Sequence, residues 1–340
     1  MSRRMLRAAL ALLAALSTTA ASAWGPDGHH TVGALADRLI AGTNAEAQVK
    51  SLLGGLTLEQ AAVWADCAKG VDPTKNYAYT STGKYPECAI YETPDGEAAM
   101  IDYVKRNDTN CGRAATDPSC HTQYHYTDEA IQRQRYRLGD VGTNNFDVVA
   151  AISATIHVLK GDPAPAPFDI KDKREALLLL SHFAGDITQP LHVGAVYLDP
   201  TGKIIDPAAG TYDPATGTQG GNLVQTIRVA TNHTSELLHA TWDDTPAVLH
   251  ADHIDAAWLA KARAEPKTRG DIYGWSADWA STTMTQARLA FKGLQFGPFQ
   301  GKDWTVPITG RYDDSMAPIK KRQLTAGGAR LAQTLMAVWP

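Results

Sequence analysis

The segment from His182 to His192 constrains the fold of this 340-residue chain more than any other stretch, and it reads His-Phe-Ala-Gly-Asp-Ile-Thr-Gln-Pro-Leu-His. It ends a strongly apolar run with helical spacing. His182 and Asp186 are four residues apart, so on a helix they project from the same face and can share one metal ion. Pro190 disfavours helix at Gln189, so the chain can turn back and bring His192 in from another direction. The segment therefore predicts a helix end that holds a metal.

A second pair with the same spacing, His239 and Asp243, lies about fifty residues further on in a segment that also looks helical. One such pair is weak evidence, because a histidine and an aspartate at this spacing often form an ordinary surface hydrogen bond. Two pairs with His192 between them are hard to explain in that way. Together they predict a zinc site with more than one ion.

The first 23 residues have the pattern of a signal peptide. Arg3, Arg4 and Arg7 precede an apolar run that is too short to span a bilayer, and Ala21-Ser-Ala23 fits a cleavage site. Cleavage after Ala23 would leave a secreted or periplasmic protein, residues 24–340, that begins at Trp24. We expect no membrane association of the mature chain.

Composition limits how the protein can bind a polyanion. Without residues 1–23 the chain has 29 basic and 36 acidic residues, a net charge of −7. A protein that holds nucleic acid by a basic surface should not have this balance. If the substrate carries phosphate, metal ions must supply the local positive charge.

The four cysteines suit disulfides in an oxidising compartment and lack the paired close spacing of a zinc–thiolate site. Four cysteines allow three pairings. We expect Cys67–Cys88 with Cys111–Cys120, because this pairing closes the shortest loops.

Helical periodicity dominates the chain, so we predict an all-α fold in one domain, with no linker long enough to favour two. Apolar faces indicate helices around residues 32–40, 148–159 and 177–183. Asn44 and Thr57 are placed as N-caps of further helices. The segments expected to be helical on composition or capping are Ala45–Leu53, Leu58–Cys67, Ala256–Ala264, Trp275–Phe291 and Gln323–Val338. Clustered turn residues predict a long loop over 197–221, with a small hairpin around Lys203–Ile205.

Three further residues, His29, Asp66 and His125, are candidate ligands only as parts of a larger sequence pattern. The matching pieces, in chain order, are Trp24-Gly-x-x-Gly-His29, Ala65-Asp66, Tyr124-His125-Tyr126-x-Asp128, the His182–His192 segment, Gly220-Gly-Asn222 and Leu238-His239-x-x-Trp242-Asp243. Over residues 24 to about 245 the chain resembles the zinc-dependent type I nucleases, which include fungal single-strand-preferring, plant bifunctional and bacterial enzymes.

The resemblance implies an all-helical fold with three zinc ions in a cleft. One ion would be held by Asp66, His125, His182 and Asp186, and a second by His192, His239 and Asp243. The third would be held by His29, by Asp186 as a bridge, and by the α-amine and carbonyl of Trp24. Nitrogen and oxygen donors are ligands that zinc accepts.

The same resemblance implies hydrolysis of single-stranded DNA and RNA to 5′-phosphorylated nucleotides, with 3′-nucleotidase activity as a corollary. A zinc-bound hydroxide beside Asp186 would attack phosphorus in line. Tyr126 is the candidate ring for stacking a base, although it could serve packing alone, and Asp128 and Asn222 are candidates for the cleft floor. We expect a monomer without a stable protein partner.

One departure from the family pattern concerns substrate range. Residues 195–219 look like an insertion of on the order of twenty residues between the Pro-Leu-His and Gly-Gly-Asn motifs, at the lip of the site, where loops often carry function. It could narrow the cleft or add substrate contacts.

Two alternatives stay open. Bacterial zinc phospholipase C shares the three-zinc plan and also begins at a ligating tryptophan, but its last ligand is typically Glu where this chain has Asp243. A secreted zinc-binding protein without turnover is disfavoured by the open coordination positions.

Overall fold

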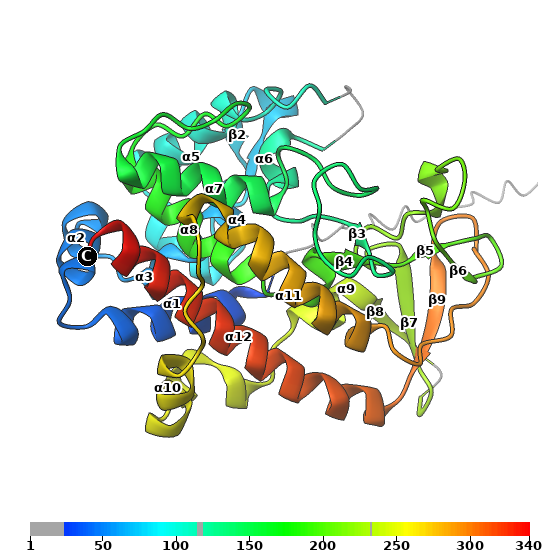
Figure 1. Ribbon diagram of the computed structural model, residues 1–340. Helices are drawn as coiled ribbons and strands as arrows, with labels where there is room; N and C mark the ends of the chain where they lie inside the picture. The colour runs from blue at the N-terminus through cyan, green and yellow to red at the C-terminus, as the bar shows by residue number, and fades with distance from the viewer. Residues whose placement is uncertain (1–23, 114–117, 232) are drawn as a thin grey trace, which may run out of the picture.

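The computed structural model describes residues 24–113, 118–231 and 233–340, and the fold is mainly helical, as predicted (Figure 1). The helices are α1 (Pro26–Ile40), α2 (Asn44–Leu53), α3 (Leu58–Ala61), α4 (Trp64–Ala68), α5 (Pro94–Arg106), α6 (Cys120–Gln123), α7 (Val148–Lys160), α8 (Lys173–Asp186), α9 (Leu238–Asp243), α10 (Ala256–Arg263), α11 (Trp275–Ala290) and α12 (Gly310–Val338).

Helix α8 forms the centre of this bundle, because α1, α2, α3, α4, α7 and α12 all contact it. Every residue from Glu175 to Asp186 is buried. A helix that is covered on all sides needs apolar residues around its whole circumference, and the run of leucines from Leu177 to Leu180 supplies them. The Asp172 side chain caps the first turn by accepting a hydrogen bond from the Glu175 N–H. The candidate ligands at the other end, His182 and Asp186, are therefore placed deep inside the protein.

The long helix α12 packs directly against α1 (Figure 1). Gly327 and Gly328 allow this close approach, since a Cβ on Gly328 would lie 2.4 Å from the Cβ of Leu35. The contact fixes α1, and with it His29, against the end of α8.

The strands are β1 (Val71–Asp72), β2 (Ala78–Tyr79), β3 (Glu129–Ala130), β4 (Gly194–Ala195), β5 (Tyr197–Leu198), β6 (Ile204–Ile205), β7 (Val224–Arg228), β8 (His233–Leu237) and β9 (Trp304–Ile308). Strands β3 to β9 form small sheets at one side of the helical bundle, whereas the pair β1 and β2 packs against α5 (Figure 1). The largest sheet has the order β8-β7-β9, in which β7 pairs antiparallel with β8 and parallel with β9. The antiparallel pair of β5 and β6 confirms the predicted hairpin; the β8-β7-β9 sheet was not predicted.

Three predicted helix boundaries were wrong. Thr43, not Asn44, caps α2, and its side chain accepts a hydrogen bond from the Glu46 N–H. The helix expected over Leu58–Cys67 is divided into α3 and α4, and the carbonyl of Ala62 at the break accepts a hydrogen bond from the buried His182 ring. Helix α12 begins at Gly310 and continues through Pro318, well before the expected start at Gln323.

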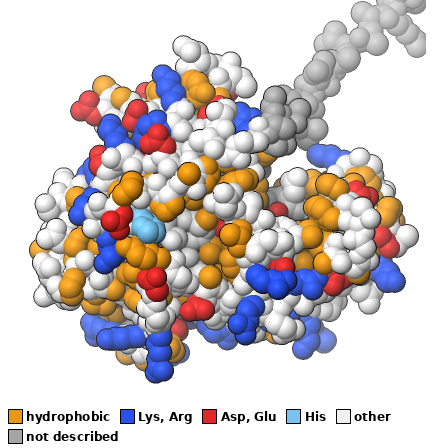
Figure 2. All heavy atoms as spheres, turned by 45° about the horizontal axis from the view of Figure 1, so that its top comes forward, with side chains coloured by type: hydrophobic (Ala, Val, Ile, Leu, Met, Phe, Trp, Pro, Cys, Tyr) orange, Lys and Arg blue, Asp and Glu red, His pale blue; other side chains and the backbone are white. Residues whose placement is uncertain are grey.

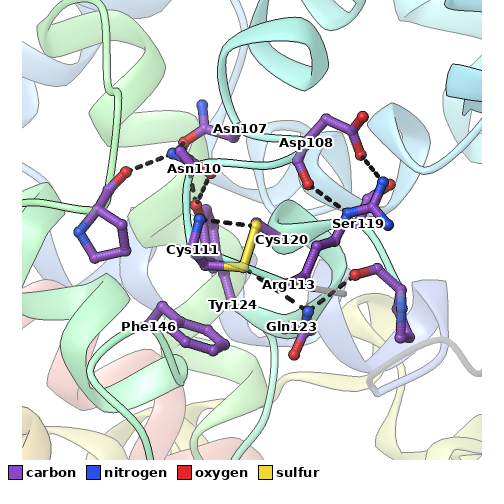
Figure 3. Close-up of a disulfide and its surroundings, with 12 residues drawn as sticks. Asn107, Asp108, Asn110, Cys111, Arg113, Ser119, Cys120, Gln123, Tyr124 and Phe146 are labelled. Carbon is purple, nitrogen blue, oxygen red and sulfur yellow. Dashed lines mark hydrogen bonds and ion pairs between the residues drawn. A yellow bond between two sulfur atoms is a disulfide. The ribbon is translucent and has the colours of Figure 1, made fainter. Parts of the chain in front are cut away.

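Both predicted disulfides are present. Cys67 at the end of α4 is bonded to Cys88, and Cys111 is bonded to Cys120 at the start of α6. Figure 3 shows the second bond beside Tyr124, whose hydroxyl donates a hydrogen bond to the side chain of Asn110. The two disulfides thus fasten the segments that carry Asp66 and His125, one residue and five residues away along the chain.

Within the described ranges, no helix is both long enough and apolar enough to cross a membrane. Residues 1–23 lie outside those ranges, so the signal peptide and its cleavage site stay predictions.

Candidate metal centre

The structure brings the predicted histidine and aspartate ligands together around the end of α8. These side chains come from four helices, α1, α4, α8 and α9, from the short 3-10 turn Pro190–His192, and from His125, which follows α6. Histidine and aspartate side chains form three groups whose ligand atoms lie within 4.8 Å of one another, and their members are His29, Asp66 and His182; His125, His182 and Asp186; and His192, His239 and Asp243. Segments more than a hundred residues apart therefore meet at one buried point.

The first predicted ligand set is compact. The Nδ1 atom of His125 lies 2.9 Å from Nε2 of His182 and 3.0 Å from Oδ2 of Asp186. Oδ1 of Asp66 lies 3.7 Å from the same His125 atom and 3.5 Å from Nε2 of His182. Four ligands at zinc's usual bond length of 2.0–2.1 Å are about 3.3 Å apart in a tetrahedron. These four side chains therefore fit a single ion without large rearrangement.

The second set is built by the 3-10 turn and α9. Nε2 of His192 lies 3.0 Å from Nε2 of His239, which lies 3.6 Å from Oδ2 of Asp243. Gln189 donates a hydrogen bond of 2.7 Å from its side-chain nitrogen to Oδ1 of Asp243, which leaves Oδ2 turned toward the histidines. Three protein ligands with room for water are the pattern of a catalytic zinc site.

Asp186 lies between His29 on one side and His125 and His182 on the other. Nε2 of His29 lies 3.5 Å from Oδ1 of Asp186, while His125 and His182 lie near Oδ2. The His29 ring stacks on His182 with centroids 3.8 Å apart, and it is fully buried although neither ring nitrogen has a hydrogen-bond partner. A buried polar atom without a partner costs about 1–3 kcal/mol, so this ring fits a site where a ligand supplies the missing partner.

Trp24 lies beside this group, and its role as a ligand stays a prediction. Its ring is fully buried and donates a hydrogen bond to the Thr188 hydroxyl, while the next residue, Gly25, donates its N–H to the carbonyl of Asp243. While Ala23 precedes it in the chain, the nitrogen of Trp24 belongs to a peptide bond.

Hydrogen bonds to backbone carbonyls set the orientation of three histidines. Nδ1 of His182 faces the carbonyl of Ala62 at 2.6 Å, that of His192 faces the carbonyl of His125 at 2.8 Å, and that of His239 faces the carbonyl of Gly220 at 2.8 Å. A carbonyl only accepts, so each ring must carry its proton on Nδ1. The lone pair of each Nε2 is then directed at the ligand group, as metal-binding histidines require.

Burial also keeps most of these rings neutral. It lowers the pKa of His29 and His239 to about 4, and that of His125 and His192 to about 3. At neutral pH a cation would therefore not need to displace a proton from these four rings. For Asp186, burial alone would raise the pKa, but His182 and His125 outweigh it and hold the pKa well below its ordinary value.

A pocket of about 320 Å³ opens beside the second ligand set. Its lining includes Tyr126, Asp128 and Asn222, the three predicted substrate contacts. Oδ1 of Asp128 is buried without a hydrogen-bond partner, and burial raises the pKa of Asp128 to about 7. The amide nitrogen of Asn222 is held by the carbonyl of Gln219 at 3.0 Å.

The sequence analysis missed two residues of this site. Lys69 lines the pocket, and its Nζ lies 2.6 Å from Oδ1 of Asp66. Gln189 holds Asp243, as described above. Their signals were available: Lys69 stands one helical turn after Asp66, and Gln189 belongs to the Gln-Pro-Leu-His motif.

The surface agrees with the acidic composition. On the face shown in Figure 2, basic and acidic side chains of the described residues are interspersed, and no continuous basic band crosses this face.

The fold and the site define a helical protein whose central helix carries two of the grouped histidine and aspartate side chains that could hold metal ions, beside an open pocket. Residues 24–339 match the S1/P1 Nuclease family, and the chain belongs to that family.

Two plant proteins are similar to it. The chain is 30% identical to Endonuclease 4 of Arabidopsis thaliana over 173 residues, 47% of this chain and 49% of that protein. It is 23% identical to Endonuclease 5 of the same plant over 338 residues, 92% of this chain and 89% of that protein. The chain therefore spans about half the length of the first of these relatives.

Proposed function

We propose that this protein is a zinc-dependent nuclease that cleaves phosphodiester bonds of single-stranded DNA and RNA and leaves 5′-phosphorylated nucleotides. The observation that carries the proposal is the position of Tyr126. It follows the candidate ligand His125 directly and lines the pocket that opens beside His192 and His239. A base in this pocket would lie next to the metal-binding groups.

Nine residues would hold three zinc ions. Their donor types, their separations and the three fixed Nε2 lone pairs all suit zinc. The sets are Asp66, His125, His182 and Asp186; His192, His239 and Asp243; and Trp24, His29 and Asp186. When bound, zinc ions lower the pKa of water and stabilise charge on a phosphate.

The chain's own side chains determine the net charge of the site and exclude bulk water from it. Three divalent ions against the carboxylates of Asp66, Asp186 and Asp243 would leave a local charge of about +3, which attracts a phosphate without a basic surface. Asp186 and His29 are fully buried, so bulk water does not weaken these interactions. Lys69 adds a further positive charge at the pocket.

Preference for single strands follows from the pocket. A base can enter beside Tyr126 only if it leaves its stack, which a duplex resists. The half-buried Asp128 and Asn222 offer polar atoms to the edge of such a base. Hydrolysis of a 3′-phosphate from a single nucleotide requires the same base position and no second nucleotide, so we propose 3′-nucleotidase activity as well.

We also propose export of the chain, activity as a monomer after cleavage before Trp24, and no membrane or stable protein partner. A zinc-dependent phospholipase C is the alternative, and Asp243 in place of the usual glutamate disfavours it.

The test uses purified protein that begins at Trp24. Single-stranded DNA, RNA, duplex DNA and a phosphatidylcholine analogue are supplied before and after chelation, and the product ends are identified. We expect zinc-dependent cleavage of single strands to 5′-phosphates, with Tyr126→Phe close to wild type and Tyr126→Ala impaired. Hydrolysis of the lipid analogue with no cleavage of nucleic acid would contradict the proposal.

A further inference from the structure

A second pocket of about 460 Å³ adjoins the metal-side pocket. The two pockets share Tyr126, Asp128 and Gln219. Most of the other lining residues come from the inserted segment 195–219 or from the segment around β9. The aromatic members of this lining are Tyr126, Tyr197, Tyr212, Phe299 and Trp304. The insertion therefore does not close the cleft but extends it.

The pocket is held in shape by contacts at both of its sides. The Tyr197 hydroxyl donates a hydrogen bond of 2.8 Å to the carbonyl of Asp128, and Tyr197 also pairs with Gly217 in an antiparallel bridge. On the other side, the Trp304 ring nitrogen donates to the carbonyl of Asp199 at 3.0 Å. A preformed pocket spares a ligand the cost of ordering it.

Two of its aromatic side chains remain open to solvent. Tyr212 is 41% exposed and Phe299 is 39% exposed, whereas Tyr197 and Trp304 are nearly fully buried behind them. The ring of Tyr212 packs on Tyr197 in an edge arrangement, with centroids 5.9 Å apart and an interplanar angle of 77°. Exposed aromatic rings in a groove are the usual platforms on which single-stranded bases stack.

The lining residues of the second pocket also indicate which part of a substrate would fit there. Among the described lining residues there is no lysine or arginine, and Asp128 is the one carboxylic acid. This pocket therefore suits an uncharged flat ring and not a phosphate. The polar side chains of Gln123 and Asn144 also line the pocket and could meet the edges of such a ring.

We propose that the insertion forms a second base-binding subsite, which holds the base of the nucleotide next to the one bound beside Tyr126, with Tyr212 as its stacking ring. The inference rests on the proposed nuclease function and adds to it a preference for substrates with at least two bases. Because the two pockets share a wall, adjacent nucleotides of one strand occupy them together.

The experiment compares a thymidine dinucleotide with two counterparts, each lacking one of the two bases. Stacking of one base is worth about 1–3 kcal/mol, so Tyr212→Ala should raise KM for the intact dinucleotide by about 5-fold to 150-fold with little change in kcat. Tyr212→Phe keeps the ring and should behave as wild type. For the counterpart that lacks the base held in this subsite, Tyr212→Ala and wild type should be equal. A dinucleotide that lacks both bases is the control substrate, and its hydrolysis by Tyr212→Ala and by wild type should be equal.

Phe299→Ala provides a second variant. It should also raise KM only for substrates that carry the base held in the second subsite. Equal kinetics of Tyr212→Ala and wild type on the intact dinucleotide would overturn the subsite. An equal rise in KM on the intact dinucleotide and on both counterparts would also overturn the subsite. The Tyr212 ring would then stabilise the loop and not bind a base. If wild-type protein cleaved neither the dinucleotide nor longer single strands, the proposed function itself would be overturned.

Discussion

Gly185→Ala is expected to displace the His29 ring without replacing any candidate ligand. Gly185 precedes Asp186 in α8, and a Cβ at this position would lie 2.8 Å from Nδ1 of His29 and 3.0 Å from its Cε1. Ordinary contact begins at 3.4 Å, so the ring must move by at least about 0.6 Å. His29 is fully buried and stacked on His182, so it has little room to do so.

The expected magnitude comes from two opposing effects. Alanine is better than glycine inside a helix by about 1 kcal/mol, while overpacking a core costs about 1–3 kcal/mol. Without metal, we therefore expect a net loss of about 0–2 kcal/mol in the free energy of unfolding. Metal sites tolerate displacements of only about 0.2 Å, so the effect on metal binding should be larger, about 10-fold to 100-fold in affinity for the ion that His29 would bind.

The assay measures bound zinc after dialysis at defined free zinc, and the thermal midpoint with and without zinc. Gly310→Ala is the matched control, because Gly310 also lies in a helix and a Cβ there meets nothing within 4 Å. The control should retain full metal content. If Gly185→Ala also retained all its zinc with unchanged affinity and activity, the assignment of His29 as a ligand would be refuted.

Three further changes test two parts of the site and a buried histidine outside it. Asp186→Ala should reduce activity more than Asp243→Ala, because Asp186 faces two ligand groups; an equal loss in steady-state assays would refute the bridging role. One residue added before Trp24 should lower kcat strongly without loss of helix content, because an amide nitrogen does not replace a free amine as a ligand; equal turnover of the two forms, with excess zinc, would show that Trp24 is no ligand. Burial lowers the pKa of His121 to about 3, so unfolding of the metal-free protein takes up a proton there below about pH 6.5, and stability falls as the pH falls. His121→Gln should remove about 1.4 kcal/mol per pH unit from that slope between about pH 4 and 6, as denaturant unfolding measures; an unchanged slope would contradict it.

The helices and most of the site could be predicted from sequence because their signals are local. Leucine spacing in α8, the Pro190 stop and the repeated His-x3-Asp spacing each lie within a dozen residues. Capping residues placed the start of α3 correctly, since Thr57 forms a capping box with Gln60.

What the sequence did not predict depends on contacts between distant segments. Strand β9 pairs with β7, about eighty residues earlier in the chain. The sequence of the five residues Trp304–Ile308 does not indicate which strand they pair with. The division between α3 and α4 coincides with a hydrogen bond from His182, 120 residues away. Lys69 was missed because a lone lysine after a helix is ordinary until its pocket is known.

The most direct test of this account is the metal content of active protein. Protein that begins at Trp24 is purified, stripped with a chelator and titrated with zinc, while bound metal and cleavage of single-stranded DNA are measured on the same samples. Activity is expected to return only as binding approaches three zinc ions per chain. Full activity with one bound ion, or with none, would contradict this expectation.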